Sequence, residues 1–271
     1  MKAGKQTGRR GRIWFDAVAD GMVPVAAAVP SVLVASGRLG GHGAAVVAVV
    51  PDEANRFARA RNGEVGLLEG WALADAVGSV VAEDRSRTEK RMVVCIVDVP
   101  SQAYGRREEA FGIHQALAAA VDAYARARLA GHPVIALLVG KAMSGAFLAH
   151  GYQANRIIAL DDPKVMVHAM GKEAAARITM RSVEQLEAWA AEIAPMAYDM
   201  DSYASLGLLY ARLKVSDPDC PSRSDVQSVI EAVSAACGDV LMKANTGLSG
   251  RLNGRNREMT RKVRQAVAEQ W

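Results

Sequence analysis

The 271-residue sequence predicts an α/β protein with a mostly parallel sheet and surrounding helices. Short, almost continuous apolar runs alternate with longer segments in which apolar residues return every three or four positions. Glycine and proline mark the short links between the two kinds of segment. Because apolar residues make up 51% of the chain, the core needs no disulfide or structural metal.

The first half of the chain begins with a basic N-terminal arm, predicted over residues 1–29, whose apolar knot at 13–15 docks on the remainder. β-Branched runs indicate two early strands, and the glycines between them indicate a tight turn at Gly40 and Gly41. The predicted elements are strands at 32–34, 45–50, 92–99 and 134–139, and helices at 64–83 and 113–129.

The second half opens on the segment Gly140-Lys141-Ala142-Met143-Ser144-Gly145-Ala146-Phe147. It is typical of a strand end, a turn of small residues and the start of a helix, which we expect to run to about Asn155. Short strands are predicted at 156–160 and 165–167, and helices at 182–194, 196–213, 224–236 and 256–270. We expect one domain over 30–215 and a helical C-terminal extension over 216–271.

Several kinds of site are excluded by the motifs that the sequence lacks. It has no GxGxxG after a strand, no GxxxxGK[ST] loop and no HExxH motif. Its five histidines show no ligand spacing and its three cysteines form no CxxC pair, so we expect no metal. Aromatic residues are only 5% of the chain, which disfavours single-strand nucleic-acid binding. With no apolar run of about 18–20 residues, a cytoplasmic protein without nucleic-acid or membrane partners is expected.

The net charge of +4 is concentrated at the two ends of the chain. Residues 1–12 carry Lys and Arg without any acidic residue, and residues 251–271 carry a large excess of Arg and Lys over Glu. Such ends are either solvated or able to steer an acidic partner.

The turn at Met143, Ser144 and Gly145 is the strongest candidate for chemistry. A tight turn into a helix leaves backbone N–H groups without partners, and these can bind an oxyanion or enolate. Two other interpretations stay open at this point. The small residues can serve close packing alone, or Ser144 can act as a nucleophile with His168 as its base.

Residues 140–171 resemble the crotonase/Clp-protease superfamily. On the Clp-type pattern His168 takes the place of the base, whereas Met143 takes the place of the nucleophile and Ser144 lies one residue out of register. This departure argues against a peptidase.

Most of the chain also resembles the γ subunits of biotin-independent malonate decarboxylases. The resemblance is carried by matching stretches at 30–34, 39–41, 46–71, 165–179 and 195–213.

This resemblance implies a crotonase-like ββα superhelix of the carboxyltransferase type. It also implies a hetero-oligomer with a homologous β subunit, acting as a carboxy-lyase on a malonyl group. The chain itself would bind no cofactor, since the malonyl group would ride on the prosthetic thiol of an acyl carrier protein. Loss of CO₂ would leave an enolate, held by amides near Met143, Ser144 and Gly145 and by a second hole at Gly40 and Gly41.

Basic side chains are the candidates for substrate binding, because a guanidinium fork suits a carboxylate. Three of them, Arg56, Arg59 and Arg61, alternate in one segment, and Lys141 precedes the turn. Three alternatives to the decarboxylase remain open. They are a subunit of a biotin-dependent carboxyltransferase, a Ser144/His168 hydrolase and a non-catalytic scaffold.

Overall fold

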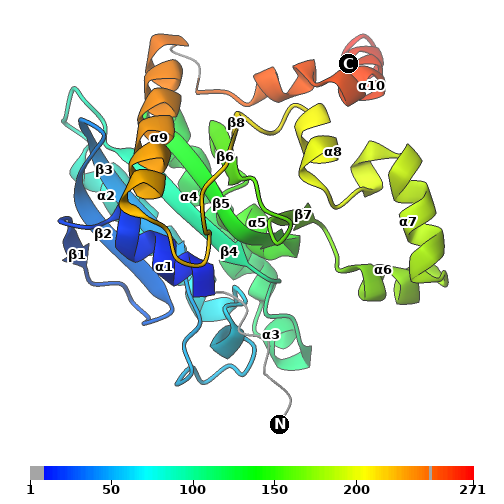
Figure 1. The fold of residues 1–271 in the computed structure, drawn as a ribbon, viewed down its shortest axis with the longest axis horizontal. Coiled ribbons are helices and arrows are strands. Elements are labelled where there is room, and N and C mark those ends of the chain that lie inside the picture. The colour runs from blue at the N-terminus through cyan, green and yellow to red at the C-terminus, as the bar shows by residue number, and fades with distance from the viewer. Residues whose placement is uncertain (1–8, 244–245) are drawn as a thin grey trace.

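The computed structural model describes residues 9–243 and 246–271 (Figure 1). The predicted basic residues before position 9 lie outside this range. The helices and strands in chain order, with η for 3-10 helices, are α1 (Arg9–Val18), β1 (Val23–Val25), β2 (Val32–Leu39), β3 (His42–Val49), η1 (Ala60–Asn62), α2 (Leu67–Glu83), β4 (Met92–Val99), α3 (Arg106–Ala110), α4 (Ile113–Leu129), β5 (Val134–Met143), α5 (Ser144–Ala149), β6 (Arg156–Leu160), β7 (Met166–His168), α6 (Lys172–Thr179), α7 (Val183–Glu192), η2 (Ala194–Met196), α8 (Met200–Ser205), β8 (Ala211–Leu213), α9 (Arg223–Lys243), η3 (Ser249–Asn253), η4 (Arg255–Arg257) and α10 (Glu258–Ala268).

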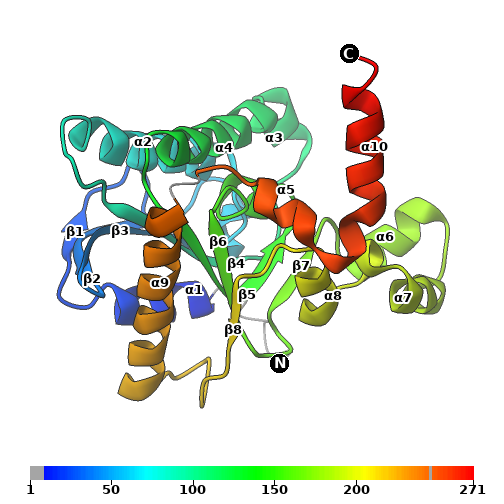
Figure 2. The ribbon, with the colours of Figure 1, turned by 90° about the horizontal axis from the view of Figure 1, so that it is seen from above.

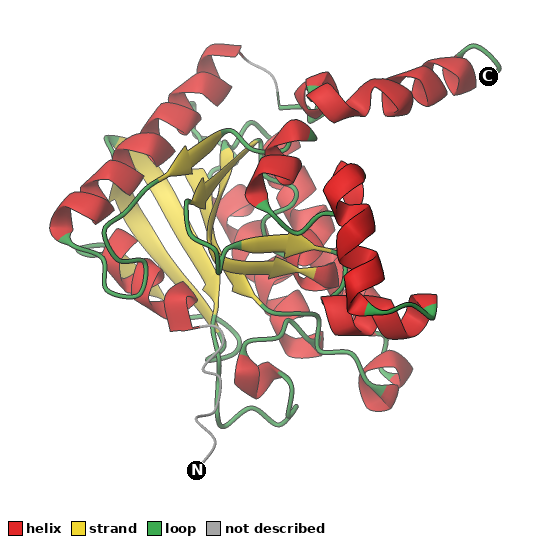
Figure 3. Ribbon diagram, turned by 45° about the vertical axis from the view of Figure 1, so that its right-hand side comes forward, coloured by secondary structure: helices red, strands yellow, loops and turns green. Residues whose placement is uncertain are grey.

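The described strands form one sheet. Its strand order is β1-β2-β3-β4-β5-β6-β8, with β7 paired to the end of β5. Strands β1, β2 and β3 are antiparallel to one another, and every later pair is parallel. The predicted α/β fold with a mostly parallel sheet is therefore confirmed. The central strands β4 and β5 are buried along almost their whole length and are mostly apolar, because helices cover both faces of the sheet (Figure 3).

Helices form a layer on each side of the sheet (Figure 2). Helix α1 contacts β3, β4 and β5, and α9 contacts β5 and β6, whereas α2 and α4 pack on each other across the other face. Trp14 of α1 is fully buried, and its indole N–H donates to Pro218 O at 2.9 Å. The apolar knot therefore docks as expected, and the boundaries at 29 and 215 stay a prediction.

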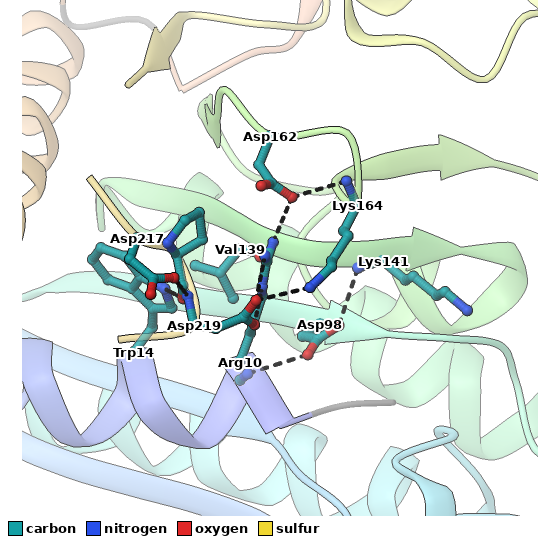
Figure 4. Close-up of polar contacts among 11 residues, drawn as sticks. Arg10, Trp14, Asp98, Val139, Lys141, Asp162, Lys164, Asp217 and Asp219 are labelled. Atoms are coloured by element: carbon teal, nitrogen blue, oxygen red, sulfur yellow. Dashed lines mark hydrogen bonds and ion pairs between the residues drawn. The ribbon is translucent and has the colours of Figure 1, made fainter. Parts of the chain in front are cut away.

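A buried arginine ties α1 to two distant loops (Figure 4). The Arg10 guanidinium donates to Asp162 Oδ1 at 2.8 Å and to Asp219 Oδ1 at 2.7 Å. Lys164 Nζ adds a bond to Asp219 Oδ2 at 2.8 Å. Hydrogen bonds from Arg10 and Lys164 hold the pKa of Asp219 well below its usual range. Breaking this cluster would leave a buried charge unpaired, so it is structural.

The predicted helix over 196–213 is wrong. The segment forms η2, the short helix α8 and then strand β8, which pairs with β6. Gly207 interrupts it with φ +72°, a conformation that ends a helix. The helix after the turn is also shorter than predicted, since α5 ends at Ala149 and Gly151 follows with φ +115°.

Candidate active site

Three of the predicted site residues line one cavity of about 420 Å³ at the carboxyl end of β5. They are Ser144, Gly145 and His168. Ligands of parallel α/β sheets bind at this edge, outside the carboxyl ends of the strands. The other residues of the lining are Phe147, Leu148, Tyr152, Val167, Ala169, Ala194, Pro195, Ala197, Tyr203, Leu206, Leu208 and Arg257. The cavity is therefore mostly apolar, with few polar groups.

The turn into α5 has an unusual backbone. Ser144 has φ +57°, a left-handed conformation that is uncommon for a residue with a side chain and that concentrates at functional sites. Its Oγ donates to Ala169 O at 2.8 Å, and Met143 pairs with His168 in the parallel ladder of β5 and β7. Strand β7 thus holds the turn in place.

The amide of Gly145 is not free, contrary to the expectation from the sequence. Its N–H donates to Oε1 of Gln102 at 2.7 Å. A Cβ added to Gly145 would lie only 2.4 Å from the same oxygen, so this contact requires glycine. The acceptor is a side chain, which can rotate away and leave the donor to another oxygen. Sequence reasoning missed Gln102, although it lies just after the buried strand β4, at the edge where β5 ends.

His168 packs against an aromatic ring and not against Ser144. Its ring stacks on Tyr198 with centroids 3.8 Å apart, and its Nδ1 lies 2.8 Å from Met170 O. Burial lowers the pKa of His168, so the imidazole is neutral near pH 7. Within residues 9–243 and 246–271 no hydrogen bond joins Ser144 to His168. The geometry gives no support to a Ser–His hydrolase.

The structure places Gly40 and Gly41 far from this cavity. They form the two-residue turn of the β2–β3 hairpin, with φ +53° and +87°, as a type I′ turn requires. This turn precedes the first residue of β3, whereas the Ser144 turn follows the last residue of β5. Because β3 and β5 run in the same direction through β4, the two turns lie at opposite edges of the sheet. The predicted second oxyanion hole at Gly40 and Gly41 is therefore corrected.

Lys141 does not line the cavity. Its backbone N–H donates to Asp98 Oδ1 at 3.0 Å, and its side chain points away from the Arg10 cluster (Figure 4). Burial raises the pKa of Asp98, which also accepts from Gly11 N–H. Lys141 therefore contacts Asp98 through its backbone N–H.

The three predicted arginines are engaged with their own loop, which follows the carboxyl end of β3. Arg56 lies over the ring of Phe57, with its Cζ 4.9 Å from the centroid. Arg59 pairs with Glu64 at 3.0 Å, and Arg61 Nε donates to Asn55 O at 2.6 Å. None of the three arginines lines the cavity.

Two polar residues of the lining, Tyr203 and Arg257, were not among the predicted site residues. Tyr203 comes from α8 and is 7% exposed, and Arg257 comes from η4 in the C-terminal extension. No local pattern marks either of them, because their place in the lining depends on how the extension packs. No helix in the part of the chain that the structure describes is long and apolar enough to cross a membrane. The described residues also contain no cluster of three or more metal-ligating side chains.

Comparison with known proteins places this chain in a family. The family model of the malonate decarboxylase gamma subunit matches residues 60–271. A chain of a Pseudomonas malonate decarboxylase hetero-tetramer, solved in complex with coenzyme A, is 61% identical. That match covers 97% of this chain and 99% of that chain, with a TM-score of 0.92.

Two more distant relatives complete the comparison. The malonyl-S-ACP:biotin-protein carboxyltransferase MADD of Malonomonas rubra is 38% identical over 162 residues, which cover 58% of this chain and 56% of that protein. The chain thus matches little more than half the length of this curated relative. Transcarboxylase 12S is only 20% identical, with a TM-score of 0.61 over 85% of this chain and 40% of that chain, so it shows the fold alone. It confirms the predicted crotonase-like, carboxyltransferase type of fold. The chain belongs to the malonate decarboxylase gamma subunit family.

Proposed function

We propose that this chain forms, with a homologous β subunit, the enzyme that decarboxylates a malonyl thioester carried on an acyl carrier protein. The relative of 61% identity is part of a malonate decarboxylase hetero-tetramer that binds coenzyme A, whose thiol arm resembles that of a carrier protein. The Malonomonas rubra relative acts on malonyl-S-ACP. The Malonomonas rubra relative therefore supports a malonyl thioester as substrate, and the Pseudomonas structure supports a hetero-oligomer.

The reaction needs little from the protein beyond a place for negative charge. When the bond between the carboxyl carbon and the α carbon breaks, CO₂ leaves and the electron pair forms an enolate on the thioester. A proton from solvent then adds to the α carbon and gives the acetyl thioester. A preorganised N–H donor for the enolate oxygen is worth about 10²–10³ in rate.

The observation that carries the proposal is the Gly145 N–H, which donates to the displaceable side chain of Gln102 beside the cavity. In the proposed complex the thioester oxygen replaces Gln102 Oε1 on this donor. Apart from Arg257, the lining is mostly apolar and His168 is neutral, and both properties favour departing CO₂ over a hydrated carboxylate.

The test replaces Gly145 with Ala or Val in the purified complex with the β subunit and follows CO₂ release from malonyl carrier protein. The added side chain occupies the approach to the amide, so turnover falls by about 10²-fold or more. Gly78→Ala is the matched control, since a Cβ there meets open space on α2. Gln102→Ala removes the internal acceptor and keeps the activity. If the complex assembles and the Gly145 variants turn over normally, the chain is a scaffold.

Transfer of the carboxyl group to a biotinyl protein is the second candidate, favoured by the carboxyltransferase activity of the Malonomonas rubra relative. The higher identity to a malonate decarboxylase chain over the full length favours direct release of CO₂. Avidin decides between them. It leaves direct decarboxylation unchanged and abolishes a reaction that depends on biotin.

A further inference from the structure

The cavity contains one cation in a mostly apolar wall. Among the described residues of its lining, Arg257 alone carries a positive charge, since burial keeps His168 neutral. No carboxylate in residues 9–243 or 246–271 lies within ion-pair distance of the Arg257 guanidinium. A guanidinium that faces an apolar cavity without a counter-ion is suited to an anionic ligand.

The C-terminal extension holds Arg257 in a defined place. Its Nε donates to Leu206 O at 3.0 Å, and the neighbouring Asn256 Nδ2 donates to Ser205 Oγ at 2.9 Å. Close to these two contacts, the backbones of Gly207 and Gly254 pass each other so closely that a Cβ on Gly254 would lie 2.4 Å from Gly207 N. The two segments are therefore in close backbone contact at this point. The Arg257 guanidinium is anchored through Nε, and its terminal nitrogens form no hydrogen bond with any described residue.

A second polar group in the lining also lacks a partner. The hydroxyl of Tyr203 is buried and forms no hydrogen bond with any described residue. Burial raises the pKa of Tyr203, and the charges of Arg251 and Arg257 act in the opposite direction. Of these two arginines, Arg257 lines the same cavity as Tyr203. An unpaired cation and an unsatisfied hydroxyl in one cavity both indicate an oxygen-rich anion as the missing ligand.

Given the proposed function, on which this inference rests, we infer that Arg257 binds the free carboxylate of the malonyl group and selects malonyl over acyl groups without a second carboxylate. A planar carboxylate matches the geometry of the terminal guanidinium nitrogens. A cavity of about 420 Å³ has room for a malonyl group and the end of its thiol arm.

The inference has a kinetic consequence. The contact between Arg257 and the carboxylate exists in the bound substrate and is lost as that carboxylate becomes neutral CO₂. It therefore stabilises the bound substrate at least as much as the transition state, so its removal raises KM and leaves kcat unchanged or higher. It also helps the product to leave, because an acetyl thioester has no carboxylate to hold.

The experiment compares Arg257→Gln with the wild type in the complex with the β subunit. We expect KM for malonyl carrier protein to rise by 10-fold or more, with kcat within two-fold or higher. The inhibition constant of acetyl carrier protein stays unchanged, because acetyl lacks the second carboxylate. Arg257→Lys keeps the charge and recovers a large part of the affinity. Arg255→Gln is the matched control, since Arg255 lies two residues away and does not line the cavity.

Two results would overturn the inference. An unchanged KM in Arg257→Gln shows that the side chain does not touch the carboxylate. A parallel loss of affinity for malonyl and acetyl carrier protein shows that the substitution disturbs the fold of the extension instead. A wild-type complex that releases no CO₂ is a different outcome, since it contradicts the proposed function and not the role of Arg257.

Discussion

Two glycine-containing turns of this protein carry the same sequence signal and differ completely in what they can bind. The Gly40–Gly41 turn closes a hairpin at one edge of the sheet, and the Ser144–Gly145 turn enters a helix at the opposite edge. In the hairpin, Ser234 Oγ donates to Gly40 O at 2.8 Å, so α9 packs directly on the turn. At Gly145, by contrast, the donor meets a side-chain amide beside a cavity.

The difference follows from the direction of the chain and not from glycine content. A hairpin returns the chain antiparallel, and its backbone groups are used by the two strands on either side. A turn from a parallel strand into a helix leaves the first N–H groups of that helix without main-chain acceptors. Glycine therefore marks both turns, and only the topology shows which of them has donors to offer.

The largest expected effect is a separation of stability from turnover: a substitution in one turn lowers stability, and a substitution in the other lowers turnover. Gly40→Ala places a Cβ 2.6 Å from Ser234 Cβ at a residue with φ +53°, so it destabilises the protein by about 1–3 kcal/mol. Its turnover per assembled complex stays at the wild-type level. Gly145→Ala does the reverse, with turnover lower by about 10²-fold and a smaller change in stability.

Thermal unfolding and CO₂ release on the same preparations measure both effects. A loss of turnover in Gly40→Ala that exceeds the loss of folded complex would contradict the separation of the two turns. In that case the hairpin would influence the active site, although the sheet places the two at opposite ends of its strands.

The next effect concerns the buried histidine that directly follows α5. His150 is fully buried, with Nε2 2.9 Å from Ile96 O, and burial lowers its pKa to about 4. His42, directly after the turn of the β2–β3 hairpin, is only partly buried. In the unfolded chain His150 titrates near pH 6.5, so below that pH the unfolded state binds a proton that the folded state does not. The contribution of His150 to the free energy of unfolding is therefore at its maximum above pH 6.5, and it falls by about 3 kcal/mol as the pH drops to 4.

Denaturant titrations at pH 7.5, 5.5 and 4.5 measure this loss. Burial also lowers the pKa of His132 and of His168, and both add to the loss in the same direction. His42→Gln, at a histidine that is only partly buried, serves as the control. His150→Gln is less stable at pH 7.5 and shows a shallower dependence, and an undiminished slope in that variant would refute the assignment to His150.

Local pattern predicted the elements whose environment is uniform. The strand over 92–99 is observed at those residues, because both of its faces are buried and no residue along it is polar until Asp98. The helix over 196–213 failed because the pairing of β8 with β6 is a contact between distant segments, which outweighs the helical period of the sequence.

The cavity was predicted in part for the same reason. Ser144, Gly145 and His168 lie on two strand ends that pair directly, so their sequence context and the family resemblance suffice to bring them together. Gln102 reaches the turn from the neighbouring strand, and Arg257 reaches the cavity from an extension anchored by two glycine backbones. Both contacts depend on three-dimensional packing, for which the sequence has no period or motif.

The smallest effect tests whether the hydroxyl of Ser144 takes part in the chemistry. Ser144→Ala loses the bond to Ala169 O, which costs about 1 kcal/mol of stability, and keeps the left-handed backbone of the wild type. Ser144→Gly loses the same bond and relieves the strain, so its stability stays within about 1 kcal/mol of the wild type. Both variants keep turnover within a few-fold, since the enolate needs backbone donors and no nucleophile. A fluorophosphonate probe leaves the wild-type complex unlabelled. Covalent labelling at Ser144, absent from Ser144→Ala, would instead make this turn a nucleophile elbow and remove the contrast with the hairpin drawn from backbone donors alone.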